Sequence, residues 1–222
     1  MIKYRPEIDG LRALAIIPVI LFHAGFQSFS GGFIGVDVFF VISGYLITSI
    51  ILAEKNFSLL NFYERRARRI LPALFFVMLA TLPFAWLYLM PNDTQALLKS
   101  IWRACFFSSN LLFYKQDGYF DTAAELKPFI HTWSLAIEEQ FYLLFPFLLL
   151  LLKRSNMRIM TGIVLMILLC SLGYAQHLVK INASAAFFLL PSRLWELLIG
   201  TLIAFYFLNR KKLLSLKINQ LV

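Results

Sequence analysis

The polar side chains best suited to chemistry in this 222-residue sequence lie in one segment, 128–142, which reads PFIHTWSLAIEEQFY. At about 100° per residue in a helix, His131, Glu138 and Tyr142 would lie on one stripe. The following residues, 143–152, are almost wholly apolar, so we expect this stripe to enter a membrane. Ionisable groups in that position are costly and by default mark a functional site. The alternative is a loop end whose charges stay in interfacial water.

A second group of candidate residues lies near the N-terminus. Arg12 and His23 are eleven residues apart, so on a helix they face the same way, roughly 16 Å apart in depth. Asp37 lies about one turn inside the next apolar segment, and we expect it to be level with His23. A carboxylate beside an imidazole can orient it, fix its tautomer and stabilise the imidazolium. The alternatives are a packing role for His23 and a helix cap or ordinary polar contact for Asp37.

Two further acidic residues extend this group. Glu138 lies about two turns into its predicted helix and could reach the depth of His23 and Asp37. Three ionisable groups at one level indicate a buried polar site more strongly than any one of them would alone. Arg193 and Glu196 are three residues apart in PSRLWELLIG and can pair within their own helix. A structural role suits that pair at least as well as a functional one.

Four arginines form a basic cluster in the segment FYERRARRI: Arg65, Arg66, Arg68 and Arg69. The cluster directly precedes an apolar run, so it suits either contact with anionic lipid or recognition of phosphates by guanidinium groups. Nucleic-acid binding is the weakest interpretation, because no nucleic-acid motif accompanies the charge. The sequence has neither an HExxH motif nor the Cys/His spacing of a metal site, so we expect no metal.

The composition indicates a membrane protein. Hydrophobic residues make up 60% of the chain and charged residues 15%, whereas soluble domains contain about 25% charged residues. Such a chain cannot cover itself with polar surface, so we expect it to cross the membrane several times. Cys105 and Cys170 predict no disulfide framework. The first apolar run lacks a small-residue cleavage site and is predicted to be a retained helix.

We predict six membrane spans, at residues 11–26, 33–52, 71–90, 132–152, 159–176 and 185–208. Basic residues concentrate beside the ends that this order places in the cytoplasm, so both termini are expected there. The segment 96–114 is apolar but contains Lys99, Arg103 and Asn110, and a span here would put the basic residues 153–158 outside. We therefore predict a re-entrant or surface-lying segment on the outer side. The predicted fold is all-α, a polytopic transmembrane helical bundle that forms one domain over residues 1–222.

Five stretches of the chain form a recognisable series: EIDGLRALAIIPVILFH, GGFIGVDVFFVISGYLI, FYERRARRILPAL, HTWSLAIEEQFYLLFP and FFLLPSRLWELLIG. In this order they resemble the motifs of the acyltransferase 3 family of bacterial membrane-bound O-acyltransferases. The first stretch carries Arg12 and His23 in the family's arginine–histidine spacing, and the third carries the family's RxxR pattern. Together the stretches are highly specific and cover nearly the whole chain, whereas RxxR alone would be a weak signal.

The resemblance implies a multi-pass enzyme of the bacterial inner membrane. Such an enzyme moves an acyl group, commonly acetyl, from cytoplasmic acyl-CoA to a carbohydrate hydroxyl. Typical acceptors in the family are the O-antigen of lipopolysaccharide, other surface polysaccharides and peptidoglycan. Acyl-CoA (acetyl-CoA) would be the donor substrate, with no permanently bound cofactor. The expected partners are the lipid bilayer, the donor and the carbohydrate acceptor, and nucleic acid is not among them.

The resemblance also implies roles for single residues. His23 would be the catalytic base, Arg12 its motif partner and Asp37 the acidic group of the second helix, and Glu138 is our fourth catalytic candidate. The predicted substrate-binding residues are His131, Trp133, Ser134, Glu139 and Tyr142.

The donor site implied by the resemblance is the RxxR arginines, in the frame Arg65–Arg68 or the frame Arg66–Arg69. His23, oriented by Asp37, would accept the proton of the attacking hydroxyl in a direct transfer. A covalent acyl-enzyme, on Ser43 for example, is the alternative route.

One departure from the family concerns the number of helices. Family membrane domains usually contain more helices than the six predicted here, and many carry a C-terminal extracytoplasmic domain of the SGNH type. We expect the chain to correspond to the N-terminal portion of a family member, incomplete at its C-terminus. The alternative functions are a membrane transporter with a buried path of His, Asp and Glu, and an inactive fragment.

Overall fold

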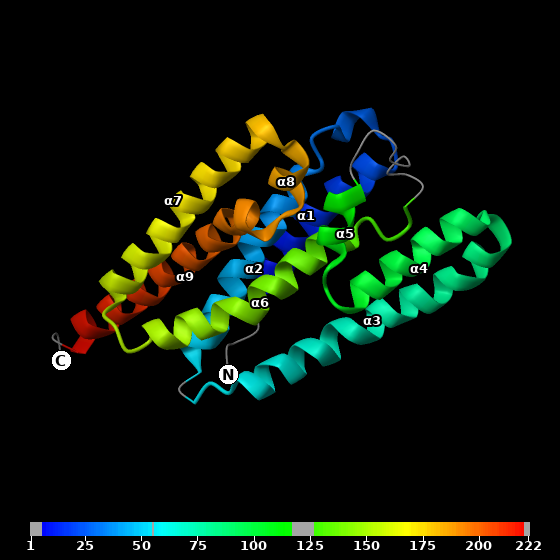
Figure 1. Cartoon of the computed structure of the whole chain (residues 1–222). Coiled ribbons are helices and arrows are strands. Elements are labelled where there is room, and N and C mark those ends of the chain that lie inside the picture. Colours follow the sequence, from blue (N-terminus) through cyan, green and yellow to red (C-terminus); the bar gives the residue numbers. More distant parts are fainter. Residues whose placement is uncertain (1–5, 55, 117–126, 220–222) are drawn as a thin grey trace. The chain divides into compact units, whose positions relative to one another are not determined.

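A computed structural model of the chain describes residues 6–54, 56–116 and 127–219 (Figure 1). Its helices are α1 (Pro6–His23), α2 (Ile34–Ala53), α3 (Leu59–Tyr88), α4 (Pro91–Cys105), α5 (Ser109–Gln116), α6 (Thr132–Leu152), α7 (Met157–Ile181), α8 (Ala183–Phe188) and α9 (Leu190–Asn219), with a 3₁₀ turn, η1, at Gln27–Phe29. No strand occurs in these three ranges, which confirms the all-α prediction. The chain divides into two compact units, Met1–Glu54 with Phe141–Val222, and Lys55–Gln140.

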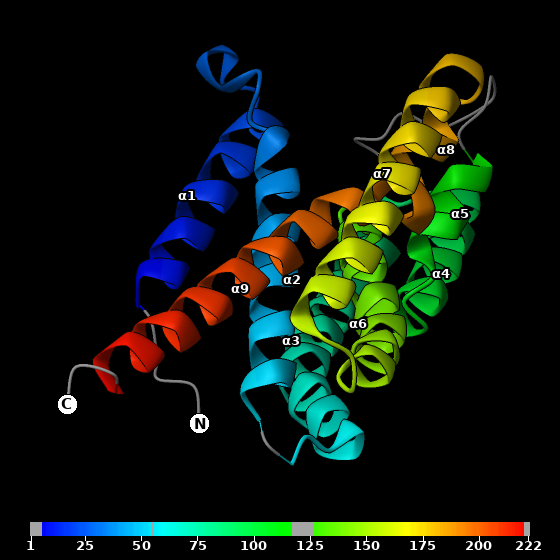
Figure 2. The same ribbon diagram turned by 90° about the vertical axis from the view of Figure 1, so that its left-hand side faces the viewer.

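In the first unit, α1 and α2 pack as an antiparallel pair (Figure 2). Gly32 lies against the backbone of Pro18, and Gly35 lies against the backbone of Ala15. A Cβ at either glycine would overlap a carbonyl oxygen of α1. The two glycines therefore let the backbones of α1 and α2 touch, as small residues do between membrane helices.

The helix α9 crosses α2 and runs in the same direction along it (Figure 2). At the crossing, Gly44 faces the backbone of Leu197 and Gly200 faces the backbone of Val41. Below it, Thr48 Oγ1 donates a hydrogen bond of 3.0 Å to Thr201 Oγ1. Two glycines and two small hydroxyl residues thus allow a close approach of the α2 and α9 backbones.

The helix α7 packs antiparallel to α9. Ser171 Oγ donates to the carbonyl oxygen of Pro191 at 2.6 Å and accepts from the amide of Trp195 at 3.0 Å. The carbonyl of Pro191 and the amide of Trp195 are four residues apart, so the serine hydroxyl of α7 bridges two backbone groups of one helical turn of α9. At the opposite end, Lys153 Nζ donates to the carbonyl oxygen of Glu54 at 3.2 Å, which joins the ends of α6 and α2. Within this unit, α1 and α2 run antiparallel, and so do α7 and α9, as the predicted order of spans requires (Figure 2).

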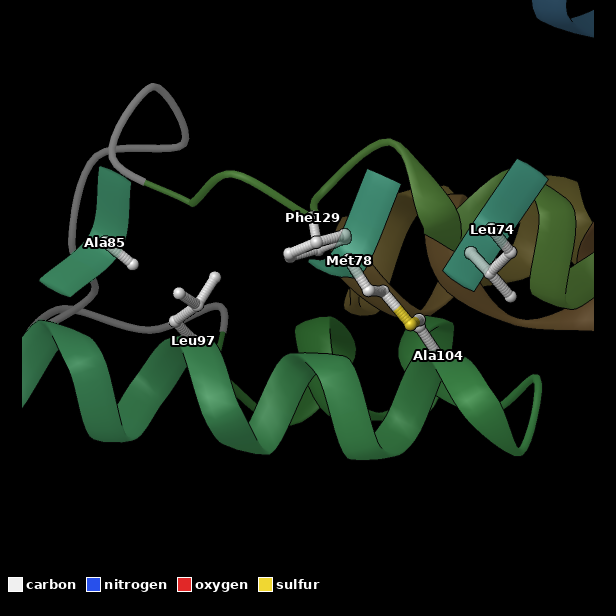
Figure 3. Close-up of a cluster of buried hydrophobic side chains, with 6 residues drawn as sticks. All are labelled: Leu74, Met78, Ala85, Leu97, Ala104 and Phe129. Carbon is white, nitrogen blue, oxygen red and sulfur yellow. The ribbon is translucent and has the colours of Figure 1, made fainter. Parts of the chain in front are cut away.

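In the second unit, α3 and α4 form an antiparallel hairpin (Figure 1). The helix α3 begins after Ser58, whose side chain accepts from the amide of Asn61. Its 30 residues give a length of about 45 Å. The predicted span from residue 71 is therefore part of a longer helix, whose first turns carry the arginine cluster. A buried cluster joins the two helices and Phe129 (Figure 3): Leu74, Met78, Ala85, Leu97, Ala104 and Phe129.

The segment 96–114, predicted to be re-entrant or surface-lying, forms two short helices, α4 and α5. The 15 residues of α4 are fewer than the roughly 20 that a span needs. The chain turns at Phe107, which has a φ of 48°. The carbonyl oxygen of Phe107 accepts from Gln140 Nε2 at 2.9 Å. A length short of a span fits both the re-entrant and the surface-lying alternative, and the placement of this segment in the membrane stays a prediction.

Five helices of the described residues are long and apolar enough to cross a membrane: Ile34–Ala53, Leu59–Tyr88, Thr132–Leu152, Met157–Ile181 and Ala183–Arg210. The predicted fourth span, 132–152, coincides with α6. The first predicted span, 11–26, corresponds to α1, which starts earlier and contains Glu7, Asp9 and Arg12. With three charged residues in its first half, α1 is not among the five. The number of spans and the cytoplasmic location of the termini stay predictions.

Candidate active site

Asp37, Arg193 and Glu196 form an ion cluster in the first unit. Arg193 Nη1 donates to Asp37 Oδ1 at 3.1 Å and to Glu196 Oε1 at 2.7 Å. Its Nε donates to the carbonyl oxygen of Phe187 at 3.2 Å, and its guanidinium carbon lies 5.0 Å from the centroid of the Phe187 ring. The cluster joins α2, α8 and α9. The predicted pair of Arg193 and Glu196 is present, and Asp37 is added to it from another helix.

His23 is the last residue of α1 and is exposed. Its Nδ1 lies 2.8 Å from the carbonyl oxygen of Val19, one turn earlier in the same helix. A carbonyl oxygen can only accept, so Nδ1 must carry the hydrogen. In the neutral imidazole, Nε2 then holds the lone pair and can accept a proton. The backbone of α1 thus fixes the tautomer that a general base requires.

Asp37 pairs with Arg193 rather than with His23, contrary to the expected hydrogen bond between carboxylate and imidazole. The expected equal depth of the two residues is also wrong. Gly32 meets Pro18 and Phe22, and Gly35 meets Ala15 and Val19. By this register Asp37 is level with about residue 15, roughly 12 Å below His23 at 1.5 Å per residue.

Arg12 lies on α1 below this level, facing α2. Its guanidinium carbon is 5.2 Å from the centroid of the Phe39 ring, and its Nη1 is 3.9 Å from Asp9 Oδ1. The Nε atom of Arg12 is buried and has no hydrogen-bond partner among the described residues. The predicted separation of Arg12 and His23 along one helix is retained, because both belong to α1. Arg12 therefore has an unused donor toward the interior of the first unit.

The arginine cluster occupies the start of α3 in the second unit. Arg65, Arg68 and Arg69 are exposed, whereas Arg66 is half-buried and lies over the ring of Phe62, 5.9 Å from its centroid. Arg68 Nη2 binds Glu64 Oε1 at 2.6 Å. The four arginines thus have different surroundings, which could not be distinguished from the sequence alone.

The polar residues at the start of α6 also belong to the second unit. Glu138 is buried, with 8% of its surface exposed, and Oε1 of Glu139 is buried without a hydrogen-bond partner among the described residues. Gln140 Nε2 donates to Phe107 and, at 2.8 Å, to Asn110 Oδ1. The expected common level of Glu138 with His23 and Asp37 stays a prediction, because those residues belong to the first unit.

The predicted substrate-binding residues have unequal exposure. His131 is exposed in the turn before α6, so it does not share the helical stripe assigned to it. Ser134 Oγ donates to the carbonyl oxygen of His131 at 3.2 Å. Trp133 in the second unit and Tyr142 in the first are both buried. Their predicted contact with substrate stays a prediction.

Arg193 is the residue whose contact across helices the sequence analysis missed. Its pairing with Glu196 follows from their spacing, but its contact with Asp37 joins residues 156 positions apart. The available signal was an arginine and a glutamate inside an otherwise apolar helix. Within the described ranges, no group of three His, Cys, Asp or Glu residues is arranged to hold a metal ion.

Comparison with known proteins gives consistent matches along the chain. The model of the acyltransferase domain of the acyltransferase 3 family matches residues 5–219. The chain is 40% identical over 211 residues to the O-acetyltransferase OatA of Staphylococcus aureus strain NCTC 8325 / PS 47, and equally to that of strain COL. Each match covers 91% of this chain and 35% of the relative, so the chain spans about a third of the length of these curated relatives. No solved structure matches it. Because the family model covers almost the whole sequence, the chain belongs to the acyltransferase 3 family.

Proposed function

We propose that this chain serves in the transfer of an acyl group, most simply acetyl, from acyl-CoA to a hydroxyl of a cell-surface carbohydrate such as O-antigen or peptidoglycan. The observation that carries the proposal is the family match over residues 5–219, together with relatives named O-acetyltransferase. The five candidate spans support a location in a membrane, which we propose to be the bacterial inner membrane.

The chemistry proposed for His23 is general-base catalysis. Nε2 accepts the proton of the acceptor hydroxyl while the hydroxyl oxygen attacks the thioester carbonyl. The carbon–sulfur bond then breaks, and the departing thiolate of CoA takes the proton from the imidazolium. The hydrogen bond from Nδ1 to Val19 supports this role, because it keeps the lone pair on Nε2. The backbone carbonyl replaces Asp37 as the group that orients the ring.

The donor end of the proposed reaction is the arginine cluster of α3. Guanidinium groups bind phosphate oxygens in pairs, so neighbouring arginines suit the phosphates of CoA. We prefer the frame Arg66–Arg69, because Arg66 is the half-buried member of the cluster, so a ligand that it binds is shielded from water on one side.

The proposal is tested by the consumption of the thioester. The chain is reconstituted in proteoliposomes with acetyl-CoA, and free CoA is measured with and without solubilised peptidoglycan fragments or lipopolysaccharide as acceptor probes. We expect CoA release to rise with one of the acceptors and acetyl ester to appear on that acceptor. Equal release with and without both acceptors would contradict the proposal and favour the transporter or the inactive-fragment alternative.

The proposed orientation places the loop after α7 outside the cell and the loop before α7 in the cytoplasm. Single cysteines at the exposed positions Lys180 and Arg154 report on the two loops without removing the side chains that cap α7 and α8. In a background with Cys105→Ala and Cys170→Ala, a membrane-impermeant thiol reagent should label Lys180→Cys in intact cells. It should label Arg154→Cys only after the cells are opened. The reverse labelling pattern would mean that α7 crosses the membrane in the direction opposite to the one proposed.

A further inference from the structure

The ion cluster around Arg193 contains more negative charge than a structural ion pair requires. Glu196, three residues further along α9, already neutralises Arg193 through a contact of 2.7 Å. Asp37 brings a second carboxylate from α2, so one cation faces two anions and the cluster has a formal charge of −1. An excess charge within a candidate span is costly and marks a functional site by default. A cluster that only held α9 together would be complete without Asp37.

The two carboxylates on Arg193 lie in different surroundings. Glu196 is 1% exposed, and its Oε2 is buried without a hydrogen-bond partner among the described residues. The side chain of Asp37 keeps 35% of its surface exposed and binds Arg193 through Oδ1. Both carboxylates therefore bind the same nitrogen of Arg193, Nη1, but Glu196 does so from a buried position and Asp37 from a partly exposed one. Among the described residues, the second oxygen of Asp37 has no hydrogen bond, so it can accept one.

The guanidinium of Arg193 is held from several directions. Besides the two carboxylates, it binds the carbonyl oxygen of Phe187 and lies over the ring of that residue. A planar guanidinium with several fixed partners has a defined orientation, which a lysine ammonium would not have. The helices that carry the ion pair are themselves locked at the backbone contacts of Gly44 and Gly200. Asp37 is thus set on rigid elements, as precise substrate positioning requires.

We propose that Arg193, braced by Glu196, is a positioning residue that holds Asp37 so that its second oxygen binds hydroxyl groups of the carbohydrate acceptor. This inference rests on the proposed acyl transfer. A carboxylate accepts hydrogen bonds from sugar hydroxyls. Asp37 thereby acts on the acceptor rather than on the imidazole of His23, from which the register of α1 and α2 separates it.

The test distinguishes a role of Arg193 in positioning Asp37 from a role in balancing the charge of the cluster. Arg193→Gln alone leaves two carboxylates without a cation and is at risk of misfolding. The double variant Arg193→Gln with Glu196→Gln keeps the formal charge of the cluster at −1, because one cation and one anion are removed together. We expect it to melt near the wild-type temperature, to keep the KM for acetyl-CoA, and to lose about 100-fold in kcat/KM for the acceptor, as small misplacements can cost. Arg158→Gln, which removes an exposed cation of α7 in the same unit, is the matched control.

The conservative variant Arg193→Lys gives a second readout. It keeps the charge but not the planar fork, so we expect a stable protein whose kcat/KM for the acceptor is reduced about tenfold. A double variant or a lysine variant with wild-type kcat/KM for the acceptor would overturn the inference, and so would equal losses for acceptor and donor.

If the wild-type chain shows no acceptor-dependent release of CoA, the proposed function fails. The contact itself is then judged by a thermal double-mutant cycle of Asp37→Asn and Arg193→Gln, and additive shifts would overturn it.

Discussion

Replacing His23 by alanine is expected to lower acyl transfer by about 10²–10⁴-fold, which is the usual contribution of general acid–base catalysis. The physical reason is the loss of Nε2, whose lone pair the hydrogen bond from Nδ1 to the carbonyl oxygen of Val19 preserves. The measurement is kcat for the acetylation of the acceptor by the full chain in proteoliposomes. Acetyl-CoA binding, measured by calorimetry, should change little, because the basic residues proposed for the donor lie on α3.

The control for this experiment is His177→Ala, which removes the exposed histidine of α7. It should leave kcat unchanged, because no step of the mechanism uses His177. His23→Gln separates catalysis from packing, since glutamine keeps polarity and approximate size but cannot take a proton at neutral pH. If His23→Gln turns over at nearly the wild-type rate, His23 is a packing residue and the proposed mechanism is wrong.

Removing Arg66 and Arg69 together is expected to weaken acetyl-CoA binding by about 100-fold. Each hydrogen bond to a charged group contributes roughly 1.5 kcal/mol or more, which corresponds to about tenfold in Kd for each arginine. The remaining binding should also depend less on salt, because screening acts on the charge contacts that have been removed. Calorimetric titration of acetyl-CoA at two salt concentrations measures both effects.

The matched control for the arginine cluster is Arg154→Ala with Arg158→Ala, which removes the same charge from exposed positions near the start of α7. It should leave the Kd of acetyl-CoA near the wild-type value. The frame is tested by Arg65→Ala with Arg68→Ala, for which a smaller loss is expected, because both of these arginines are exposed whereas Arg66 is half-buried. Unchanged binding in the Arg66–Arg69 variant, with normal membrane insertion, would show that the cluster does not bind the donor and acts only in topology or lipid contact.

The helices of this protein could be predicted from the sequence because their causes are local. Long apolar runs inside a membrane must satisfy every backbone group within the segment, and the helix does so. The predicted span 132–152 therefore coincides with α6. The boundaries shifted where polar residues continue a helix, as in the first turns of α3, which contain the arginine cluster. The five motif stretches, taken together, were likewise sufficient to predict the family.

The partners of the site residues could not be predicted in this way, because they depend on how helices meet. The depth of Asp37 was counted from the end of its own helix, whereas its true level follows from Gly32 and Gly35 against α1. The contact of Asp37 with Arg193 joins residues 156 positions apart, and no periodicity of either helix predicts it. By itself, then, the sequence determined the helices and the family. The tertiary structure decided the partners of His23 and Asp37, because helical periodicity fixes which residues share a face, and only backbone contact between glycines and neighbouring helices fixes the register.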